Sequence, residues 1–221
     1  MRDLLLVFLK WPEPGATKTR LVPALGEEGA ARLYRLLAET GMGATRPRER
    51  EYERLLCFAP QDARERIQGW FPGEALWAQP EGELGRRMAS AIDEGFRRGA
   101  DRVALVGTDL PWVSRSLVAR GFAALASADL VLGPAHDGGY YLVALARPRP
   151  ELFEGVEWST PGVLAATRAR AAHLGLRDHC LEPMRDIDTV DDLRDTWERL
   201  EPLLAPDPDL RQKVAQVIGR P

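Results

Sequence analysis

A short loop after the first apolar run carries residue types that bind phosphate. The run Leu4–Leu9 is followed by Pro12-Glu-Pro-Gly-Ala-Thr-Lys-Thr-Arg-Leu21. In open α/β sheets ligands bind at the carboxyl ends of the strands, and Gly15 would let the backbone approach such a ligand. Lys18 and Arg20 add the positive charge that a diphosphate needs. The loop matches neither Walker A nor GxGxxG, so a solvated turn with ordinary surface charges is an equally good interpretation of this segment alone.

Two acidic segments that are far apart in the sequence carry the ligand types of a hard metal ion. Asp109 lies in Val103-Ala-Leu-Val-Gly-Thr-Asp-Leu-Pro111, where its carboxylate would reach the crevice beyond a buried strand. The second segment is Asp186-Ile-Asp-Thr-Val-Asp-Asp192. Carboxylates from both segments can share one Mg²⁺ or Mn²⁺ that bridges phosphate oxygens. An aspartate in a turn is common, and it is the second segment that favours a metal site at Asp109.

Two of these acidic residues have a structural interpretation. Asp191 and Asp192 fall in the first turn of an expected helix, where negative charge is favourable for the helix dipole. We therefore expect them to stabilise the helix rather than to bind a ligand.

A glycine pair marks a further segment, Gly133-Pro-Ala-His-Asp-Gly-Gly-Tyr-Tyr141. Asp-Gly is a strong hairpin signal, so we expect a tight turn between two strands. Because such a turn can also face a ligand site, Asp137 is a candidate to receive an acceptor hydroxyl or a metal. His136 is interpreted as an incidental polar residue of the loop.

The segment Gln79-Pro-Glu-Gly-Glu-Leu-Gly-Arg-Arg-Met88 leads from an expected strand into an expected helix. Gln79 and the backbone at Gly82 and Gly85 are suited to meet a base or a ribose. Arg86 and Arg87 are interpreted as exposed surface residues.

Short apolar runs and amphipathic stretches alternate along the chain, which is typical of βα units and a mainly parallel sheet. We find no repeat or linker and expect one domain over 1–221. The expected strands are 4–9, 55–59, 75–78, 102–107, 130–133 and 140–145. The expected helices are 27–40, a short one capped by Asp62, 84–98, 115–126 capped by Ser114, one starting at Thr160-Pro161, one after Asp188-Thr189, and a short one after Pro208.

Composition excludes several classes of protein. The chain has 221 residues, 45% hydrophobic and 29% charged, with net charge -3 and pI ≈ 5.7. That charge is not the basic footprint of a general nucleic-acid binder. Leu4–Leu9 is too short to span a membrane and no secretory cleavage site follows it, so we expect a cytoplasmic protein. Cys57 and Cys180 are expected to be buried thiols, and three scattered histidines give no zinc-ligand spacing.

Six segments together resemble a family of uncharacterised bacterial proteins grouped with the nucleotide-diphospho-sugar transferases. In chain order they are FLKWPEPGATKTRL, QPEGELGRRM, VGTDLP, LGPAHDGGYYLVAL, WSTPGVL and DIDTVDDL. They extend from Phe8 to Leu193, and their order and spacing are specific although no single segment is. This DUF2064-like family is sometimes called the arsenosugar-biosynthesis glycosyltransferase family and is related to guanylyl- and molybdopterin nucleotidyltransferases.

The resemblance implies a GT-A fold, a Rossmann-like three-layer α/β sandwich with a mixed, mainly parallel sheet flanked by helices. The phosphate-binding residues that it implies are Gly15, Lys18 and Arg20. With the segments described above, the candidate nucleotide-binding residues are Pro14, Gly15, Lys18, Arg20, Gln79, Gly82, Gly85 and Thr108. The implied metal ligands are Asp109 and Asp188, with Asp186 in reserve. The candidate catalytic residues are Lys18, Arg20, Asp109 and Asp137.

These residues predict a Mg²⁺- or Mn²⁺-dependent glycosyltransferase-like enzyme that uses a nucleotide-diphosphate sugar and a small-molecule acceptor. One alternative is a nucleotidylyltransferase that consumes a nucleoside triphosphate and releases pyrophosphate. Another is a non-catalytic nucleotide-binding protein. The base, the sugar, the acceptor and the oligomeric state are left open by the residues.

Overall fold

The computed structural model describes residues 1–49 and 51–220, which divide into two compact units. The sheet unit comprises Met1–Trp11, Thr45–Gly107 and Val113–Met184. The helical unit comprises Pro12–Ala44, Thr108–Trp112 and Arg185–Pro221. Each unit is therefore built from three separate segments of the chain, and one domain over 1–221 stays a prediction.

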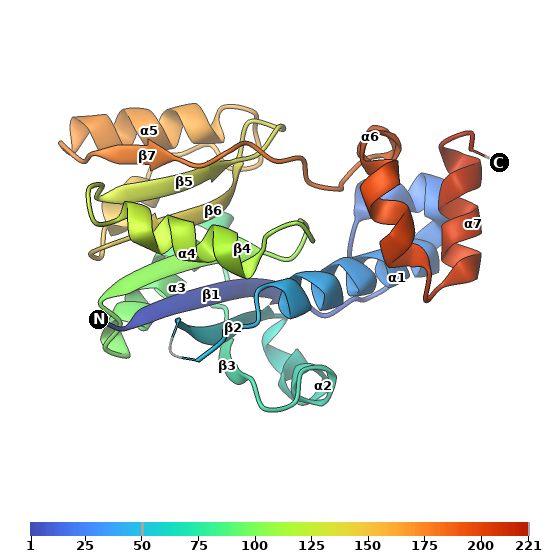
Figure 1. The fold of residues 1–221 in the computed structure, drawn as a ribbon, viewed down its shortest axis with the longest axis horizontal. Helices are drawn as coiled ribbons and strands as arrows, with labels where there is room; N and C mark the ends of the chain where they lie inside the picture. The colour runs from blue at the N-terminus through green and yellow to red at the C-terminus, as the bar shows by residue number, and fades with distance from the viewer. Residues whose placement is uncertain (50, 221) are drawn as a thin grey trace. The chain divides into compact units, whose positions relative to one another are not determined.

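The sheet unit carries a seven-stranded sheet (Figure 1). Its strands are β1 (Asp3–Lys10), β2 (Glu53–Ala59), β3 (Ala75–Ala78), β4 (Arg102–Gly107), β5 (Leu130–Pro134), β6 (Tyr140–Leu145) and β7 (Asp178–Cys180). Its helices are η2 (Gln61–Ala63), α2 (Arg64–Trp70), α3 (Leu84–Arg97), α4 (Arg115–Ala124), η3 (Pro150–Phe153) and α5 (Val163–His173).

The strands lie in the order β3-β2-β1-β4-β6-β5-β7. Strand β1 is parallel to β2 and β4, β2 is parallel to β3, and β5 is parallel to β7. Strand β6 is antiparallel to both of its neighbours, β4 and β5. The sheet is thus mixed and mainly parallel, as predicted.

Helices cover both faces of this sheet. Val143 of β6 belongs to a buried cluster that includes Met88 and Ile92 of α3. The next residue back, Leu142, points to the opposite face, because successive side chains of a strand alternate. There it approaches Gly121 of α4, where an added Cβ would lie 3.6 Å from the leucine. The layers α3, sheet and α4 confirm the predicted three-layer α/β sandwich (Figure 1).

The helical unit has no strand among its described residues. Its elements are η1 (Thr19–Leu21), α1 (Val22–Ala44), α6 (Val190–Leu200), η4 (Glu201–Leu204) and α7 (Pro208–Val217). Leu33 of α1, Leu193 of α6 and Val214 of α7 are fully buried in one common cluster. Gly26 interrupts α1 with φ 70° and ψ 166°, so its regular part starts at Glu27, where the sequence predicted the helix to begin.

Most predicted elements are confirmed within two or three residues, and three features differ. Helix α5 begins at Val163 rather than at Thr160-Pro161, because Thr160 donates its hydroxyl to the Glu157 carbonyl and does not cap the helix. Asp62 lies inside η2 and does not cap α2. Strand β7 was not predicted, since Asp178–Cys180 has no apolar pattern.

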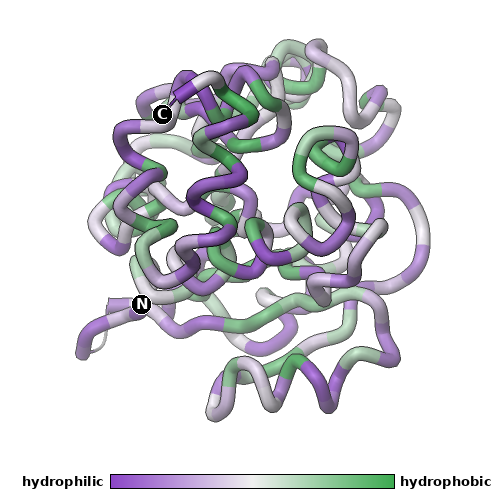
Figure 2. Tube along the Cα trace, turned by 90° about the vertical axis from the view of Figure 1, so that its right-hand side faces the viewer, coloured by the Kyte–Doolittle hydropathy of each residue, from purple (hydrophilic) through white to green (hydrophobic). Residues whose placement is uncertain are grey.

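Hydrophilic and hydrophobic stretches alternate over short distances along the chain trace (Figure 2). In the part of the chain that the structure describes, none of the helices combines the length and apolar character needed to cross a bilayer. Both thiols are free; Cys57 is buried as predicted, whereas Cys180 is only half-buried.

We expect Leu6→Ala to lower the free energy of unfolding by about 2–5 kcal/mol, because Leu6 is fully buried in the core of the sheet unit and its truncation leaves a cavity. Urea unfolding followed by circular dichroism measures the change. Leu174→Ala is the matched control, because Leu174 is one of the exposed large hydrophobic residues. Equal losses in the two variants would contradict this assignment of the core.

Candidate functional site

The predicted phosphate loop forms a tight turn at the start of the helical unit. The backbone N–H of Ala16 donates to the Glu13 carbonyl at 3.1 Å, with Pro14 and Gly15 between them. Gly15 has φ +76°, and a proline followed by a residue with positive φ is the pattern of a type II turn. A side chain at Gly15 would be strained by this φ and would crowd the Glu27 carboxyl group.

Lys18 is the buried cation of this loop. Its side chain is 2% exposed, and its Nζ lies 2.6 Å from Oδ1 of Asp109 and 3.7 Å from Oδ1 of Asp188. The backbone of Lys18 is left-handed, with φ 49° and ψ 44°, which is unusual for a residue with a Cβ. The structure therefore brings together three residues that the sequence had placed in separate segments.

Arg20 completes a group that we call the ionic cluster, made of Lys18, Arg20, Asp109 and Asp188. Nη1 of Arg20 lies 3.0 Å from Oδ2 of Asp188. The side chain of Arg20 is 65% exposed, whereas those of Asp109 and Asp188 are 56% and 35% exposed. The two carboxylates thus remain open to solvent while the lysine between them is buried.

Thr108 and Tyr34 adjoin the cluster. Thr108 is buried next to Asp109 in the sequence, and its Oγ1 lies 2.8 Å from the Tyr34 hydroxyl. Tyr34 is not among the residues predicted from the sequence, because it lies in the apolar stripe of α1 and belongs to no motif. This hydrogen bond attaches Thr108, and with it the segment that carries Asp109, to helix α1.

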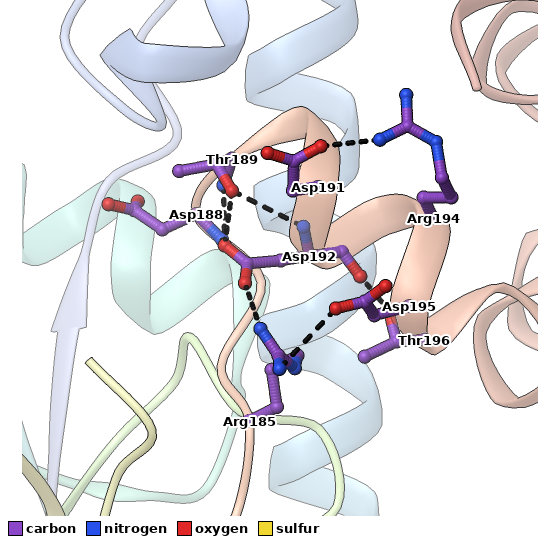
Figure 3. A network of polar contacts seen from close by, with 8 residues as sticks. All are labelled: Arg185, Asp188, Thr189, Asp191, Asp192, Arg194, Asp195 and Thr196. Atoms are coloured by element: carbon purple, nitrogen blue, oxygen red, sulfur yellow. Dashed lines mark hydrogen bonds and ion pairs between the residues drawn. The ribbon is translucent and has the colours of Figure 1, made fainter.

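Asp188 is held in place by its neighbours in the chain (Figure 3). Ile187 is fully buried in the core of the helical unit. The carboxylate of Asp192 accepts hydrogen bonds from the backbone N–H groups of Asp188 and Thr189, at 3.2 Å and 2.8 Å, and Thr189 caps α6 in return. Asp192 also pairs with Arg185.

These contacts confirm the structural interpretation of the helix start. Burial alone would raise the pKa of Asp192, but hydrogen bonds from Thr189 and Asp188 outweigh it and hold that pKa below its usual value. Asp191 is exposed and pairs with Arg194 on the helix surface. Asp186 is half-buried, and its role as a reserve metal ligand stays a prediction.

A second group of predicted residues lies in the sheet unit and centres on Gln79. This side chain is buried; its Nε2 donates to the Cys57 carbonyl at 2.6 Å, and its Oε1 accepts from Nη1 of Arg87 at 3.1 Å. Arg87 is half-buried rather than exposed as predicted, and burial lowers its pKa. Both functional ends of the Gln79 amide therefore have a protein partner.

Gly82 and Gly85 of this segment are each required for a different steric reason. Gly82 has φ +120°, a conformation that side chains rarely adopt. Gly85 is buried at the start of α3, and a Cβ there would overlap the indole of Trp158. Trp158 stacks on Phe153 and meets Tyr140 edge-on. It was not singled out as a site residue, although it opens the WSTPGVL segment.

Asp137 lies in the predicted hairpin turn between β5 and β6. Its Oδ1 accepts from the backbone N–H of Gly139 at 2.8 Å, and the side chain is exposed. Gly138 has φ +89° and leaves no room for a Cβ beside the Pro161 carbonyl. The hairpin is confirmed, whereas the catalytic role of Asp137 stays a prediction.

The carboxylates of the ionic cluster are too few to hold a metal ion without ligands from outside the protein. Within residues 1–49 and 51–220, no group of three or more His, Cys, Asp or Glu side chains could hold a metal. The ionic cluster offers two carboxylates, Asp109 and Asp188. Mg²⁺ in proteins is commonly held by one or two carboxylates plus substrate phosphates. The pair therefore fits an ion whose remaining ligands come from a diphosphate and water.

Comparisons with known proteins identify one family model and several similar proteins. The profile of a family described as uncharacterised protein conserved in bacteria (DUF2064) matches residues 44–160. The crystal structure of a candidate nucleotide-diphospho-sugar transferase from Desulfovibrio desulfuricans G20 is 31% identical, with a TM-score of 0.87, over 97% of this chain and 99% of that one.

Two further proteins are similar to this chain, one over part of the sequence and the other in fold alone. A phosphoenolpyruvate guanylyltransferase from Sphaerobacter thermophilus is 34% identical over 125 residues, which are 56% of this chain and 59% of that protein. The match thus spans less than two thirds of that relative. A CMP:2-keto-3-deoxy-manno-octonic acid synthetase complexed with CTP shares the fold, with a TM-score of 0.55 and 11% identity over 94% of this chain and 100% of that one.

We expect Asp192→Asn to lower the free energy of unfolding by about 0.5–2 kcal/mol at pH 7, because it weakens the helix cap. Asp191→Asn is the control, since it removes the same charge from the same helical turn without touching the cap. Chemical unfolding at several pH values measures both. The pKa of Asp192 is lowered in the folded chain, so its stabilisation is present above about pH 4 and is lost as pH falls through the lowered value. A loss that persists unchanged at acidic pH would contradict this origin.

Proposed function

The chain belongs to the bacterial DUF2064 family, and we propose that it is a transferase that uses a nucleotide-diphosphate sugar as donor and a small molecule as acceptor. The observation that carries the proposal is the ionic cluster, in which one buried ammonium lies within 4 Å of two solvent-open carboxylates. The full-length similarity to a candidate nucleotide-diphospho-sugar transferase supports this donor class.

Lys18 and Arg20 would bind the diphosphate of the donor. A buried ammonium acts in surroundings of low dielectric, where its interaction with phosphate is stronger than in water. Negative charge builds on the diphosphate as it leaves with the nucleotide, and cations fixed in advance stabilise that charge. The left-handed backbone of Lys18 and the turn at Gly15 hold the loop in this arrangement.

Asp109 and Asp188 would hold Mg²⁺ or Mn²⁺, with Asp186 in reserve. When bound, such an ion supplies Lewis-acid stabilisation of the diphosphate oxygens. Asp192 orients the backbone of Asp188 through the hydrogen bond described above.

The residues of the sheet unit are assigned to the nucleoside and the acceptor. Since the amide of Gln79 is already bonded within the protein, we assign it to supporting the segment, and the backbone at Gly82 and Gly85 to nucleoside contact. The side chain of Asp137 is exposed, and a carboxylate can accept further hydrogen bonds besides the one from Gly139, which suits an acceptor hydroxyl.

Nucleotidylyl transfer is the second candidate, and the 34% identical guanylyltransferase favours it. The same loop would then bind a triphosphate, and pyrophosphate would leave. Lys18 and Arg20 are the cations of the cluster, and both already face a carboxylate. This modest positive charge suits a diphosphate better than a triphosphate.

We expect Asp109→Asn to abolish the Mg²⁺-dependent part of nucleotide binding without unfolding the chain. The side chain is half-exposed, an asparagine oxygen can still accept from the Lys18 ammonium, and Asp188 remains as a charge partner of Lys18. Thermal shift with a panel of nucleoside diphosphates and sugar nucleotides, with and without Mg²⁺, measures this effect. Equal Mg²⁺-dependent stabilisation in variant and wild type would remove Asp109 from the metal site.

We further expect sugar nucleotides to bind at least as tightly as the matching triphosphates in the presence of Mg²⁺. Calorimetry compares the affinities, and slow hydrolysis of a sugar nucleotide without acceptor is the expected activity. Release of pyrophosphate from a triphosphate, with no turnover of any sugar nucleotide, would replace the first candidate with the second.

A further inference from the structure

Lys18 occupies the position between the two carboxylates that a divalent cation would need. Its Nζ contacts Asp109 at 2.6 Å and lies within 4 Å of Asp188, and its side chain is almost completely removed from solvent. Asp188 is in addition paired with Arg20. A metal ion that approached the carboxylates would therefore meet two positive charges at short range.

The charges of the ionic cluster balance as the structure stands, with two cations against two carboxylates. A divalent cation alone would leave the cluster with excess positive charge, and a diphosphate alone would face the two carboxylates. Bound together, the cation can pair with the carboxylates and the phosphates with Lys18 and Arg20. Each ligand then removes the repulsion that opposes the other.

The small number of carboxylates in the ionic cluster leads to the same conclusion. In the described part of the chain, Asp109 and Asp188 form no metal-binding group with a third His, Cys, Asp or Glu side chain. A divalent cation that displaced Lys18 would still need oxygen ligands from elsewhere, and phosphate oxygens are suited to this role.

We propose that Lys18 is an exchangeable counter-ion, which neutralises Asp109 and Asp188 in the unliganded protein and moves to the phosphates when a nucleotide and a divalent cation bind together. The inference rests on the proposed function for its ligands, a diphosphate and a divalent cation. Coupling between two ligands is reciprocal. The bound nucleotide therefore raises the affinity for the metal ion by the same factor by which the bound metal ion raises the affinity for the nucleotide.

The test uses Mn²⁺ alone and metal-free GDP as separate probes on the full chain. In Lys18→Met the side chain keeps its approximate length and loses its charge. We expect the affinity for Mn²⁺ alone to rise about tenfold and the affinity for metal-free GDP to fall about tenfold, within the range typical of coupled sites. Calorimetry measures both. Changes of opposite sign are the signature, because a damaged fold would weaken both ligands.

Lys213→Met is the matched control. Lys213 belongs to helix α7 of the same unit, and its ammonium lies beside Gly26 of α1, outside the ionic cluster. It should change neither affinity. Arg20→Met is the second variant, since its exposed side chain can be replaced with little risk to the fold. It should raise the affinity for Mn²⁺ as well, though less than Lys18→Met. If circular dichroism shows that Lys18→Met is unfolded, the Mn²⁺ affinity of Arg20→Met tests the counter-ion proposal in its place.

An unchanged or weaker affinity for Mn²⁺ alone in every variant of Lys18 or Arg20 that folds would overturn the counter-ion proposal. It would do so even if nucleotides bind the wild type with Mn²⁺, as the proposed function requires. Tighter Mn²⁺ binding by Lys18→Met would support it. If no nucleoside diphosphate or sugar nucleotide binds wild type in the presence of Mn²⁺, the proposed function fails, and tighter Mn²⁺ binding by the variant would still show that Lys18 neutralises the carboxylate pair.

Discussion

The ammonium of Lys18 joins the three chain segments that make up the helical unit. Lys18 lies in the first segment, its partner Asp109 in the second and Asp188 in the third. The rest of the unit supports this contact through the core around α1, α6 and α7 and through the bond between Tyr34 and Thr108. An ammonium that is so completely buried depends on its charge partners, since an unpaired charge in a low-dielectric interior is costly.

Two carboxylates of the acidic segment after residue 185 make different kinds of contact. Asp188 faces the cations, whereas Asp192 turns back to the backbone of Asp188 and Thr189. The helix start therefore uses one carboxylate to fix the position of the other. Side chains that position a ligand group need this support, because loose groups lose both affinity and rate.

In the sheet unit, the segment around Gln79 is held by contacts within the protein. Arg87 and the Cys57 carbonyl hold the amide of Gln79, and the indole of Trp158 packs against Gly85. The polar side chain of this segment is thus used inside the protein. Its glycines meet constraints of the protein itself, since Gly82 has a positive φ and the indole of Trp158 occupies the space of a Gly85 side chain.

The sequence by itself determined the order of strands and helices, because apolar period, caps and turn residues act over a few neighbours. It predicted β3, β4 and β6 to the residue, the cap at Ser114 and the hairpin at Asp137. It also singled out Lys18, Arg20, Asp109 and Asp188 from residue types and family resemblance. It missed β7, whose residues Asp178–Cys180 become a strand only because β5 offers them an edge.

Only the tertiary structure decided which of these charges meet. That Lys18 is buried between two aspartates, that Arg87 is bonded to Gln79, and that Tyr34 holds Thr108 depend on segments separated by 8 to 170 residues. No local pattern encodes such pairings, since the energy of burying a charge depends on which distant partner the folded chain brings within reach.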